Sequence, residues 1–506
     1  MFMGGLIPAY YACPKPHRWK LLLAASAAFY AFSGVFNLLF IAAAATSSYI
    51  AARAMGQLHA AQSAFLENGK LSREDRKRYK AANKTKRMRW LAACLLFNFG
   101  ALAVLKYANF VLPGADILEG FILPLGISFY TFQTAGYVID VYRGKYAAER
   151  NPFKLALFTA FFPQLIQGPI SRFDDLKRTL YNREPFDAKN LSYGLQRIAL
   201  GLFKKLVIAD RLLIAVKAVS AGPDEYGGVY ALMGVFLYAV TLYADFTGGI
   251  DMAIGAAETL GIRLTENFNR PFYSKSITEY WRRWHMTLGA WFRDYLFYPI
   301  SVCGPMLKLT QKARAAMGNG FGRRVTVYIA TMVVWFTTGL WHGARMNFVV
   351  WGLLNGAVII VSQELEPLYA RFHSRFRVKD MPVYGAFEIA RTFCLMSFIR
   401  SLDIYRDAGT AFRAIGSIFT GFIPESGFGG IDALGLPAAD YAVAAAAVAL
   451  LIIIGRVRKG GGVRDRLARQ KPALRCAVYI ALVAAILVFG VYGTGYDAKQ
   501  FIYNQF

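Results

Sequence analysis

The chain has few charged residues, few acidic residues and no two cysteines at the spacing of a metal or redox site. Of its 506 residues only 18% are charged while 56% are hydrophobic, a composition that soluble proteins rarely have. Acidic residues number 31 against 58 lysines and arginines, which gives a formal net charge of +27. No two of the five cysteines have metal-ligand or redox spacing, so the sequence predicts neither a zinc site nor a disulfide framework.

Apolar stretches of roughly membrane-spanning length recur along the chain. Clear examples are residues 90–112, 229–246, 325–340, 441–455 and 474–491. About 20 apolar residues in a helix cross the hydrocarbon core of a bilayer. These stretches lack the alternation of lipid-facing strands, and backbone groups in lipid must be paired, so we expect helices rather than a barrel. The sequence therefore predicts an all-α polytopic membrane protein.

The excess positive charge is concentrated in short connecting segments, at residues 70–89, 172–189, 308–324 and 456–475. Connections rich in lysine and arginine stay cytoplasmic and contact anionic headgroups, so membrane topology accounts for the basicity. Nucleic-acid binding is the alternative, but no binding motif or stacking platform accompanies the charge. The first 20 residues have an apolar part before a basic part, the reverse of a cleavable signal peptide, so we expect a short first membrane segment there.

Two apolar segments contain residues that interrupt helices. Residues 123–145 include Pro124 and Gly126, and residues 152–173 carry Gln167 among large apolar side chains. Broken helices at membrane depth occur where protein shelters them or where they line a cavity, so we interpret residues 152–173 as a re-entrant segment. Ordinary hydrogen bonds between helices are the alternative explanation for these polar groups.

Asp245 lies within the apolar run of YADFTGGIDMAIG. A carboxylate at that depth is a candidate for a functional site. The alternative is that Asp245 is the partner of one of the many arginines.

The segment at residues 266–300 predicts an amphipathic helix. Ser276 stands three positions before Glu279, as in a capping box, and large aromatic residues then recur at three- and four-residue intervals. This period places His285 on the apolar side, an unusual position for a histidine without a role. The alternative is an interfacial helix whose histidine is satisfied by a backbone carbonyl.

His342 lies near the middle of an otherwise uncharged apolar region, in TGLWHGARMNF. An ionisable side chain there is costly unless it faces a polar cavity, so we interpret His342 as functional, with a structural histidine as the alternative. A neutral imidazole, whose pKa is ordinarily near 6.5, can take a proton from an attacking hydroxyl and return it to a leaving group.

Six stretches, in order along the chain, resemble the successive signatures of bacterial membrane-bound O-acyltransferases. They are LPLGISFYTFQTAGYVIDVYRG (123–144), FFPQLIQGPISRFDDL (161–176), GLFKKLVIAD (201–210), YADFTGGIDMAIG (243–255), ENFNRPFYSKSITEYWRRWHMTLGAWFRDYLFYPI (266–300) and TGLWHGARMNFVVWGLLNG (338–356). The ending FGVYGTGYDAKQFIYNQF is similar to the C-terminus of the alginate O-acetyltransferase branch.

The resemblance implies a single membrane-embedded acyltransferase domain over residues 1–506, with a core at about 120–400 and C-terminal helices at about 438–493. It implies a bundle of roughly eleven transmembrane helices, with re-entrant helices, around a central funnel. In such proteins a cytoplasmic acyl thioester meets its acceptor at a histidine in the central constriction. The WHG motif carries that histidine over to His342, and the RRWH motif carries the second family histidine over to His285.

Other candidate residues are expected to line the funnel, with packing or headgroup contacts as the alternative role for each. For the three tryptophans among them we favour a wall or anchor role. The candidates are Asn267, Asn269, Arg282, Arg283, Trp281, Trp284, Asp245, Gln167, Trp341 and Asn347. We expect no metal and no bound cofactor. One departure from the family pattern is that Arg345 and Met346 stand where serine and tryptophan usually follow WHG-Ala.

Three classes of function remain for the chain, which we expect to be a multi-pass protein of the bacterial inner membrane. The first is transfer of an acetyl group from acetyl-CoA or another cytosolic thioester to a cell-surface polysaccharide, directly or through a secreted esterase-like partner. The second is D-alanyl transfer from an acyl carrier protein to teichoic acid. The third is a transporter or scaffold, which the broken helices and Asp245 would suit. The FIYNQF ending and the basic residues at 308–324 favour acetyl transfer.

Overall fold

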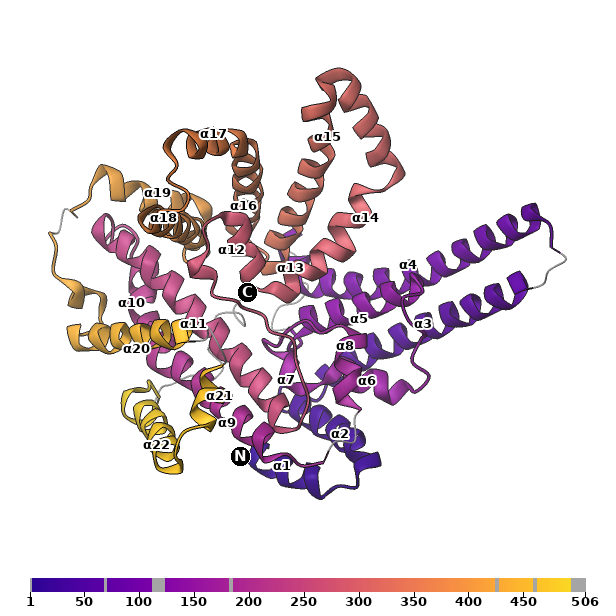
Figure 1. The fold of residues 1–506 in the computed structure, drawn as a ribbon, viewed down its shortest axis with the longest axis horizontal. Coiled ribbons are helices and arrows are strands. Elements are labelled where there is room, and N and C mark those ends of the chain that lie inside the picture. The colour runs from indigo at the N-terminus through magenta and orange to yellow at the C-terminus, as the bar shows by residue number, and fades with distance from the viewer. Residues whose placement is uncertain are drawn as a thin grey trace. The chain divides into compact units, whose positions relative to one another are not determined.

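The computed structural model describes residues 2–67, 71–111, 123–181, 185–423, 427–457 and 462–492, and within these ranges it contains helices and no strand (Figure 1). The chain divides into two compact units. The first comprises Met1–Gly194 and Ala253–Thr265, and the second comprises Leu195–Met252 and Glu266–Phe506.

Seven helices of the described ranges are long and apolar enough to cross a membrane, which confirms the predicted all-α polytopic membrane protein. Fewer helices meet these limits than the eleven expected, so that number stays a prediction. The seven are α3 (Asn37–Glu67), α4 (Arg73–Val111), α11 (Val229–Thr259), α15 (Gly304–His342), α16 (Met346–Glu364), α20 (Ala438–Val457) and α22 (Pro472–Phe489).

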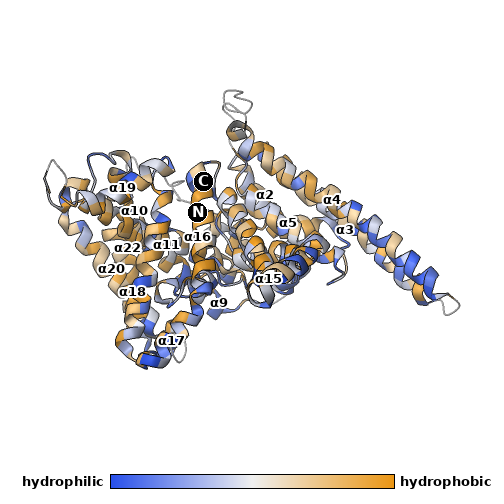
Figure 2. Ribbon diagram, turned by 90° about the horizontal axis from the view of Figure 1, so that it is seen from above, coloured by the Kyte–Doolittle hydropathy of each residue, from blue (hydrophilic) through white to orange (hydrophobic). Residues whose placement is uncertain are grey.

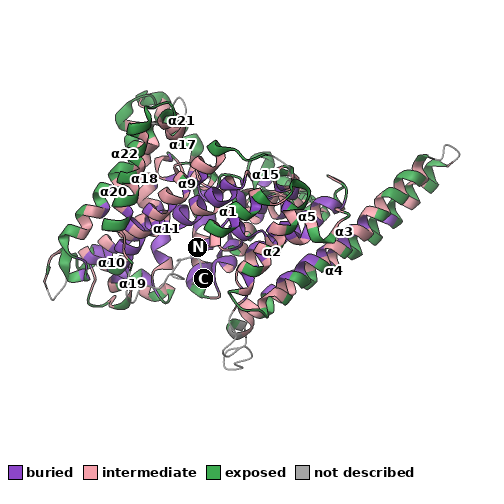
Figure 3. Ribbon diagram, turned by 90° about the horizontal axis from the view of Figure 1, so that it is seen from below, coloured by how far each residue is buried: buried purple, intermediate pink, exposed green. Residues whose placement is uncertain are grey.

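The candidate spans differ in how much of their surface the protein covers. In the most apolar window of α11, 61% of the residues are buried, against 11% in α20 and 6% in α22. Figure 3 shows the exposed surfaces of α20 and α22. Large apolar side chains such as Ile453 and Leu487 are 59% and 62% exposed there. Exposed apolar surface of this extent is expected where a helix faces lipid.

In the first unit, α3 and α4 form a long antiparallel pair. Arg87 donates hydrogen bonds of 3.1 Å to Gln62 and to His59 Nδ1, and the Phe65 and Tyr79 rings stack at 3.8 Å. The prediction that residues 70–89 form a connecting segment is wrong for most of its length, because α4 begins at Arg73. Figure 2 shows the change from the hydrophilic start of α4 to its hydrophobic continuation.

The other predicted breaks are partly visible. The segment after Pro124 becomes helix α5 (Ile127–Tyr142), and the residue before it, Gly126, has a φ of 69°. Residues 152–173 form the short helices α6 (Pro152–Ala160) and α7 (Phe162–Leu165) before α8 (Phe173–Leu180) begins. They are therefore not one plain span, whereas their re-entrance into a membrane stays a prediction. The FIYNQF ending lies outside the described residues.

In the second unit, α15 and α16 pack closely, and this packing holds the WHG segment against the start of α16. A Cβ atom on Gly339 would lie 2.4 Å from the Phe348 carbonyl oxygen, and one on Gly352 would lie 2.3 Å from the Trp335 carbonyl oxygen. Small residues let helix backbones approach in this way. As a result His342, the last residue of α15, lies against the first turns of α16.

We expect Gly352→Val to lower the unfolding temperature in detergent and to reduce activity, because its side chain would collide with the α15 backbone and overpacking costs about 1–3 kcal/mol or more. Gly320→Val, on the same helical hairpin, is the control, because no atom lies within 4 Å of a Cβ built there. Equal unfolding temperatures for the two variants would contradict this account of the packing.

Candidate active site

The two predicted histidines lie in one aromatic cluster of the second unit. His342 is 5% exposed, and its ring lies 4.6 Å from the Trp351 ring and 4.9 Å from the Trp341 ring, measured between centroids. His285 is 3% exposed, and its ring lies 4.9 Å from that of Phe246 and 5.9 Å from that of Trp341. Both imidazoles therefore pack on the same indole.

The backbone at His285 differs from the prediction. Half of the capping box is present: Ser276 accepts a hydrogen bond from the Glu279 N–H at 3.2 Å, whereas the Glu279 carboxylate accepts from the Lys275 N–H at 2.8 Å, one residue before the N-cap. The expected continuous amphipathic helix is wrong, because α12 (Ile277–Arg283) ends before His285 and α13 (Met286–Phe292) begins after it. His285 has φ 45° and ψ 53°, the left-handed region, which costs an L-residue about 1–2 kcal/mol. Strained backbone of this kind clusters at functional sites, although Arg270 and Arg377, each with φ 49°, share it outside the histidine cluster.

Asn267 determines which ring nitrogen of His285 carries the hydrogen. The Asn267 Oδ1 atom accepts from the Thr287 N–H at 3.1 Å and from the Thr287 hydroxyl at 2.9 Å, and it lies 3.2 Å from His285 Nδ1. A backbone N–H only donates, so the atom that it contacts is the amide oxygen and not the amide nitrogen. His285 Nδ1 must then carry the hydrogen, and Nε2 carries the basic lone pair.

His285 is neutral at physiological pH. Burial and, secondly, the positive charge of Arg400 lower the pKa of its imidazole to about 3. The residue lies outside the seven candidate spans. A neutral imidazole with a fixed tautomer can accept a proton or a hydrogen bond at Nε2.

Arg400 is a site residue that the sequence analysis missed. It ends α18 (Pro382–Arg400), is 4% exposed, and forms a 3.4 Å ion pair with Asp403. The centre of its guanidinium lies 4.9 Å from the Trp284 ring and 5.0 Å from the Trp351 ring. Its position at the end of the apolar run 392–399 was the available signal.

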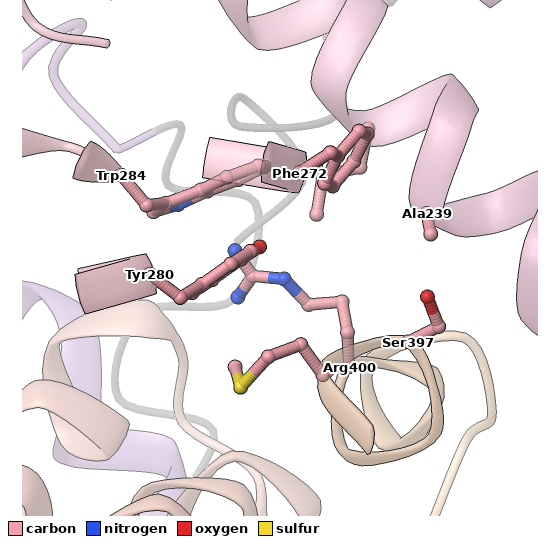
Figure 4. Close-up of a pocket in the computed structure, with 8 residues that line it drawn as sticks. Ala239, Phe272, Tyr280, Trp284, Ser397 and Arg400 are labelled. Atoms are coloured by element: carbon pink, nitrogen blue, oxygen red, sulfur yellow. The ribbon is translucent and has the colours of Figure 1, made fainter. Parts of the chain in front are cut away.

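A small pocket lies beside Arg400. Figure 4 shows the Arg400 side chain reaching toward the rings of Tyr280 and Trp284. The walls are mainly apolar and come from α11, α12, α18 and the segment before α12. The lining residues are Ala239, Leu242, Phe272, Tyr280, Trp284, Met396, Ser397 and Arg400.

Two predicted residues have structural partners within the cluster. Trp281 donates from its indole N–H to Asn355 Oδ1 at 3.2 Å. Asn347 donates to the carbonyl oxygens of Leu402 and Tyr405, both at 3.1 Å, and so fastens the start of α16 to the segment after α18.

Other predicted residues are not brought to the histidines. Asn269 and Arg282 are exposed, and Arg283 is half-buried and paired with Glu279. Arg345, which departs from the family motif, is also exposed, so its charge lies outside the buried cluster.

Asp245 and Gln167 have different environments. Asp245 is fully buried and forms a 2.7 Å ion pair with Lys205, which also pairs with Asp210 at 2.7 Å. Asp245 is therefore the partner of a basic residue, although that residue is a lysine and not an arginine. Gln167 belongs to the first unit, where both polar atoms of its buried amide have no hydrogen-bond partner. Within the described residues, no group of three or more histidine, cysteine or acidic side chains could hold a metal ion.

Residues 147–402, which include both histidines and Arg400, match the model of the membrane-bound O-acyltransferase (MBOAT) family. The chain belongs to this family. Its expected assignment as a membrane O-acyltransferase is thereby confirmed.

Relatives of this MBOAT chain include named acyltransferases. It is 34% identical to a "Probable alginate O-acetylase AlgI" of Azotobacter vinelandii over 380 residues, which cover 72% of this chain and 67% of the relative. It is 31% identical to a peptidoglycan O-acetyltransferase of Helicobacter pylori over 324 residues, 58% of each chain. A teichoic acid D-alanyltransferase of Bacillus subtilis is 29% identical over 242 residues, 46% of this chain and 58% of the relative. The chain thus spans about two thirds or less of these relatives' own lengths.

Asn267→Leu should lower acyl transfer roughly 10- to 100-fold, because the orienting acceptor for His285 Nδ1 is removed while the side-chain volume is nearly kept. Initial rates on purified membranes, normalised to protein amount, measure the effect. Asn269→Leu is the matched control, since its side chain is exposed. The orienting role is refuted by an Asn267 variant that is as active as this control.

Asp245→Asn should lower the free energy of unfolding by about 3 kcal/mol, because it removes one carboxylate from a buried ion pair. Thermal unfolding in detergent measures this loss. Asp294→Asn, which removes an ion pair with the exposed Arg293, should change stability little. An Asp245 variant with wild-type stability and no activity would instead assign this carboxylate to the reaction.

Proposed function

We propose that the chain transfers an acetyl group from a cytosolic acyl thioester, acetyl-CoA, to hydroxyl groups of an extracytoplasmic cell-surface polysaccharide. It acts as one membrane-embedded domain of the bacterial inner membrane. The observation that carries this proposal is the pair of buried histidines on Trp341, within the stretch that matches the MBOAT family. Relatives named for O-acetylation of alginate and of peptidoglycan support a polysaccharide acceptor.

The step requires one base and one leaving group. His342 takes the proton of the acceptor hydroxyl as the hydroxyl oxygen bonds to the thioester carbonyl carbon. The carbon–sulfur bond then breaks, and the imidazolium returns the proton to the departing thiolate. His285, whose Nε2 is an acceptor, supports the reaction by accepting a hydrogen bond from a second hydroxyl of the acceptor sugar.

Access to the histidines is part of the proposal. Their side chains are nearly buried, so donor and acceptor need a passage that opens from the cytoplasmic face and from the opposite face. The expected funnel supplies that passage. The acetyl group then reaches the polysaccharide directly or through a secreted esterase-like partner.

D-alanyl transfer from an acyl carrier protein to teichoic acid is the second candidate, because relatives of that name match about half of this chain. The donor distinguishes the two functions. Membranes that consume acetyl-CoA and acetylate a polysaccharide support the first, whereas use of a D-alanyl carrier protein alone supports the second.

His342→Ala should abolish acetyl transfer from radiolabelled acetyl-CoA to envelope polysaccharide, because the proton acceptor is removed. His373→Ala is the control, since His373 lies on α17 (Glu366–Phe376) and contacts Tyr384. Retained wild-type transfer by the His342 variant would remove the catalytic assignment of this residue.

A further inference from the structure

We propose that Arg400 is a catalytic residue that stabilises the negative charge on the acyl carbonyl oxygen, in a pocket that takes the short acyl end of the donor. This inference rests on the proposed function. Negative charge develops on the carbonyl oxygen in the transfer step, and neither histidine is assigned to stabilise it. Arg400 supplies that stabilising group.

The tryptophan rings around Arg400 hold its positively charged guanidinium in a fixed position. The guanidinium lies over the rings of Trp284 and Trp351, and Trp281 lies 5.9 Å away. Indole faces attract cations, and the packing of three large rings restricts the rotamers of the arginine. A charge that is fixed before the reaction needs no reorganisation in the transition state, which is the requirement for electrostatic catalysis.

Two buried arginines of the second unit pair with carboxylates at different distances. Arg197 donates to Asp251 at 3.0 Å and to Glu266 at 2.6 and 2.7 Å, so it has close contacts with two carboxylates. The ion pair between Arg400 and Asp403 is 3.4 Å long. Burial raises the pKa of the Asp403 carboxyl and so weakens it as a counter-ion, whereas Arg400 acts in the opposite direction.

The two tryptophans connect Arg400 with both histidines. Trp351 packs on the guanidinium and, at 4.6 Å between centroids, on the ring of His342. Trp284 packs on the guanidinium and precedes His285 in the chain. The cation is therefore built into the same cluster as the two imidazoles.

The lining of the pocket beside Arg400 suits a small acyl group. Its free space, about 10 Å³, is room for about one water molecule, so an acetyl group enters it only when the lining side chains move apart. Leu242, Phe272 and Met396 give it apolar walls for a methyl group, and Arg400 is its charged wall. Figure 4 shows Phe272 and Arg400 among these lining side chains. An acetyl group has these two parts, a methyl and a carbonyl.

The chemistry explains what a cation does at this position. When the hydroxyl oxygen bonds to the carbonyl carbon, the electron pair of the C=O bond moves onto oxygen, and the hydroxyl proton goes to the histidine. The oxyanion then re-forms the C=O bond as the carbon–sulfur bond breaks, and the thiolate takes the proton. Arg400 donates its N–H groups to the oxyanion and stabilises it more strongly than the neutral carbonyl.

The alternative is that Arg400 only holds the tryptophans in place. The two roles differ in which kinetic constant changes. Arg400→Met and Arg400→Lys should be compared with Arg197→Lys as a control at a buried arginine outside the pocket. The measurements are kcat, KM for acetyl-CoA, binding of a non-transferable thioether analogue, and the unfolding temperature in detergent.

For Arg400→Met we expect kcat to fall about 100- to 1,000-fold, with KM and analogue binding within about threefold of wild type. Arg400→Lys should fold with an unfolding temperature close to wild type and recover part of kcat, because it keeps the charge but not the planar fork. The proposal is overturned if Arg400→Met keeps kcat within about threefold, or if both variants lose kcat, analogue binding and stability in parallel.

A second variant tests the pocket without altering the charge. Ala239→Leu places a larger side chain in the pocket from α11 and should lower kcat/KM at least about tenfold; because Ala239 is buried, the unfolding temperature should also fall. Unchanged kcat/KM in a folded Ala239→Leu protein would overturn the pocket as the acyl site. If the wild-type protein transfers no acyl group, the proposed function fails, whereas an active wild type with an equally active Arg400→Met overturns this inference alone.

Discussion

The site depends on the contact between the Asn267 amide oxygen and His285. That single oxygen accepts from both hydrogen-bonding groups of Thr287 and from His285 Nδ1, so it fixes a turn of the backbone and a tautomer together. The residue before Thr287, Met286, also donates its backbone N–H to the Asn267 carbonyl oxygen at 2.9 Å. These bonds account for how a histidine holds a strained left-handed conformation at 3% exposure.

The second constraint is the close approach of α15 and α16. Because Gly339 and Gly352 let the two backbones approach, the ring of His342 reaches Trp351 on the neighbouring helix. Trp351 in turn packs on Arg400. The cation of Arg400, the proposed base His342 and the second imidazole, His285, are thus linked through tryptophan rings. Close packing holds these rings in position.

Much of this arrangement could be predicted from the sequence. Apolar runs predicted the spans, the Ser276 and Glu279 pair predicted the start of α12, and an ionisable residue in an apolar region indicated His342. The break at His285 could not be predicted, because the helical period continues through it and no glycine or proline marks it. The basic residues at 73–89 were misread as a connection, although lysine, arginine and alanine favour helix.

Sequence patterns could not predict the contacts between residues that lie far apart in the chain. Arg400 lies more than a hundred residues after Trp284, and Asn347 fastens α16 through carbonyl groups that leave no pattern in the sequence. A local period reports which face of a helix is buried and not which distant side chain meets it.

A polar passage must reach the buried imidazoles for donor and acceptor to meet there. A cryo-EM map of the protein in lipid nanodiscs, with a bound thioether analogue of acetyl-CoA that keeps a ketone carbonyl, tests this requirement most directly. We predict the analogue's carbonyl beside Arg400 and His342, with an opening toward each face of the membrane. A map that shows His342 enclosed by tightly packed rings, with the analogue bound elsewhere, would contradict it.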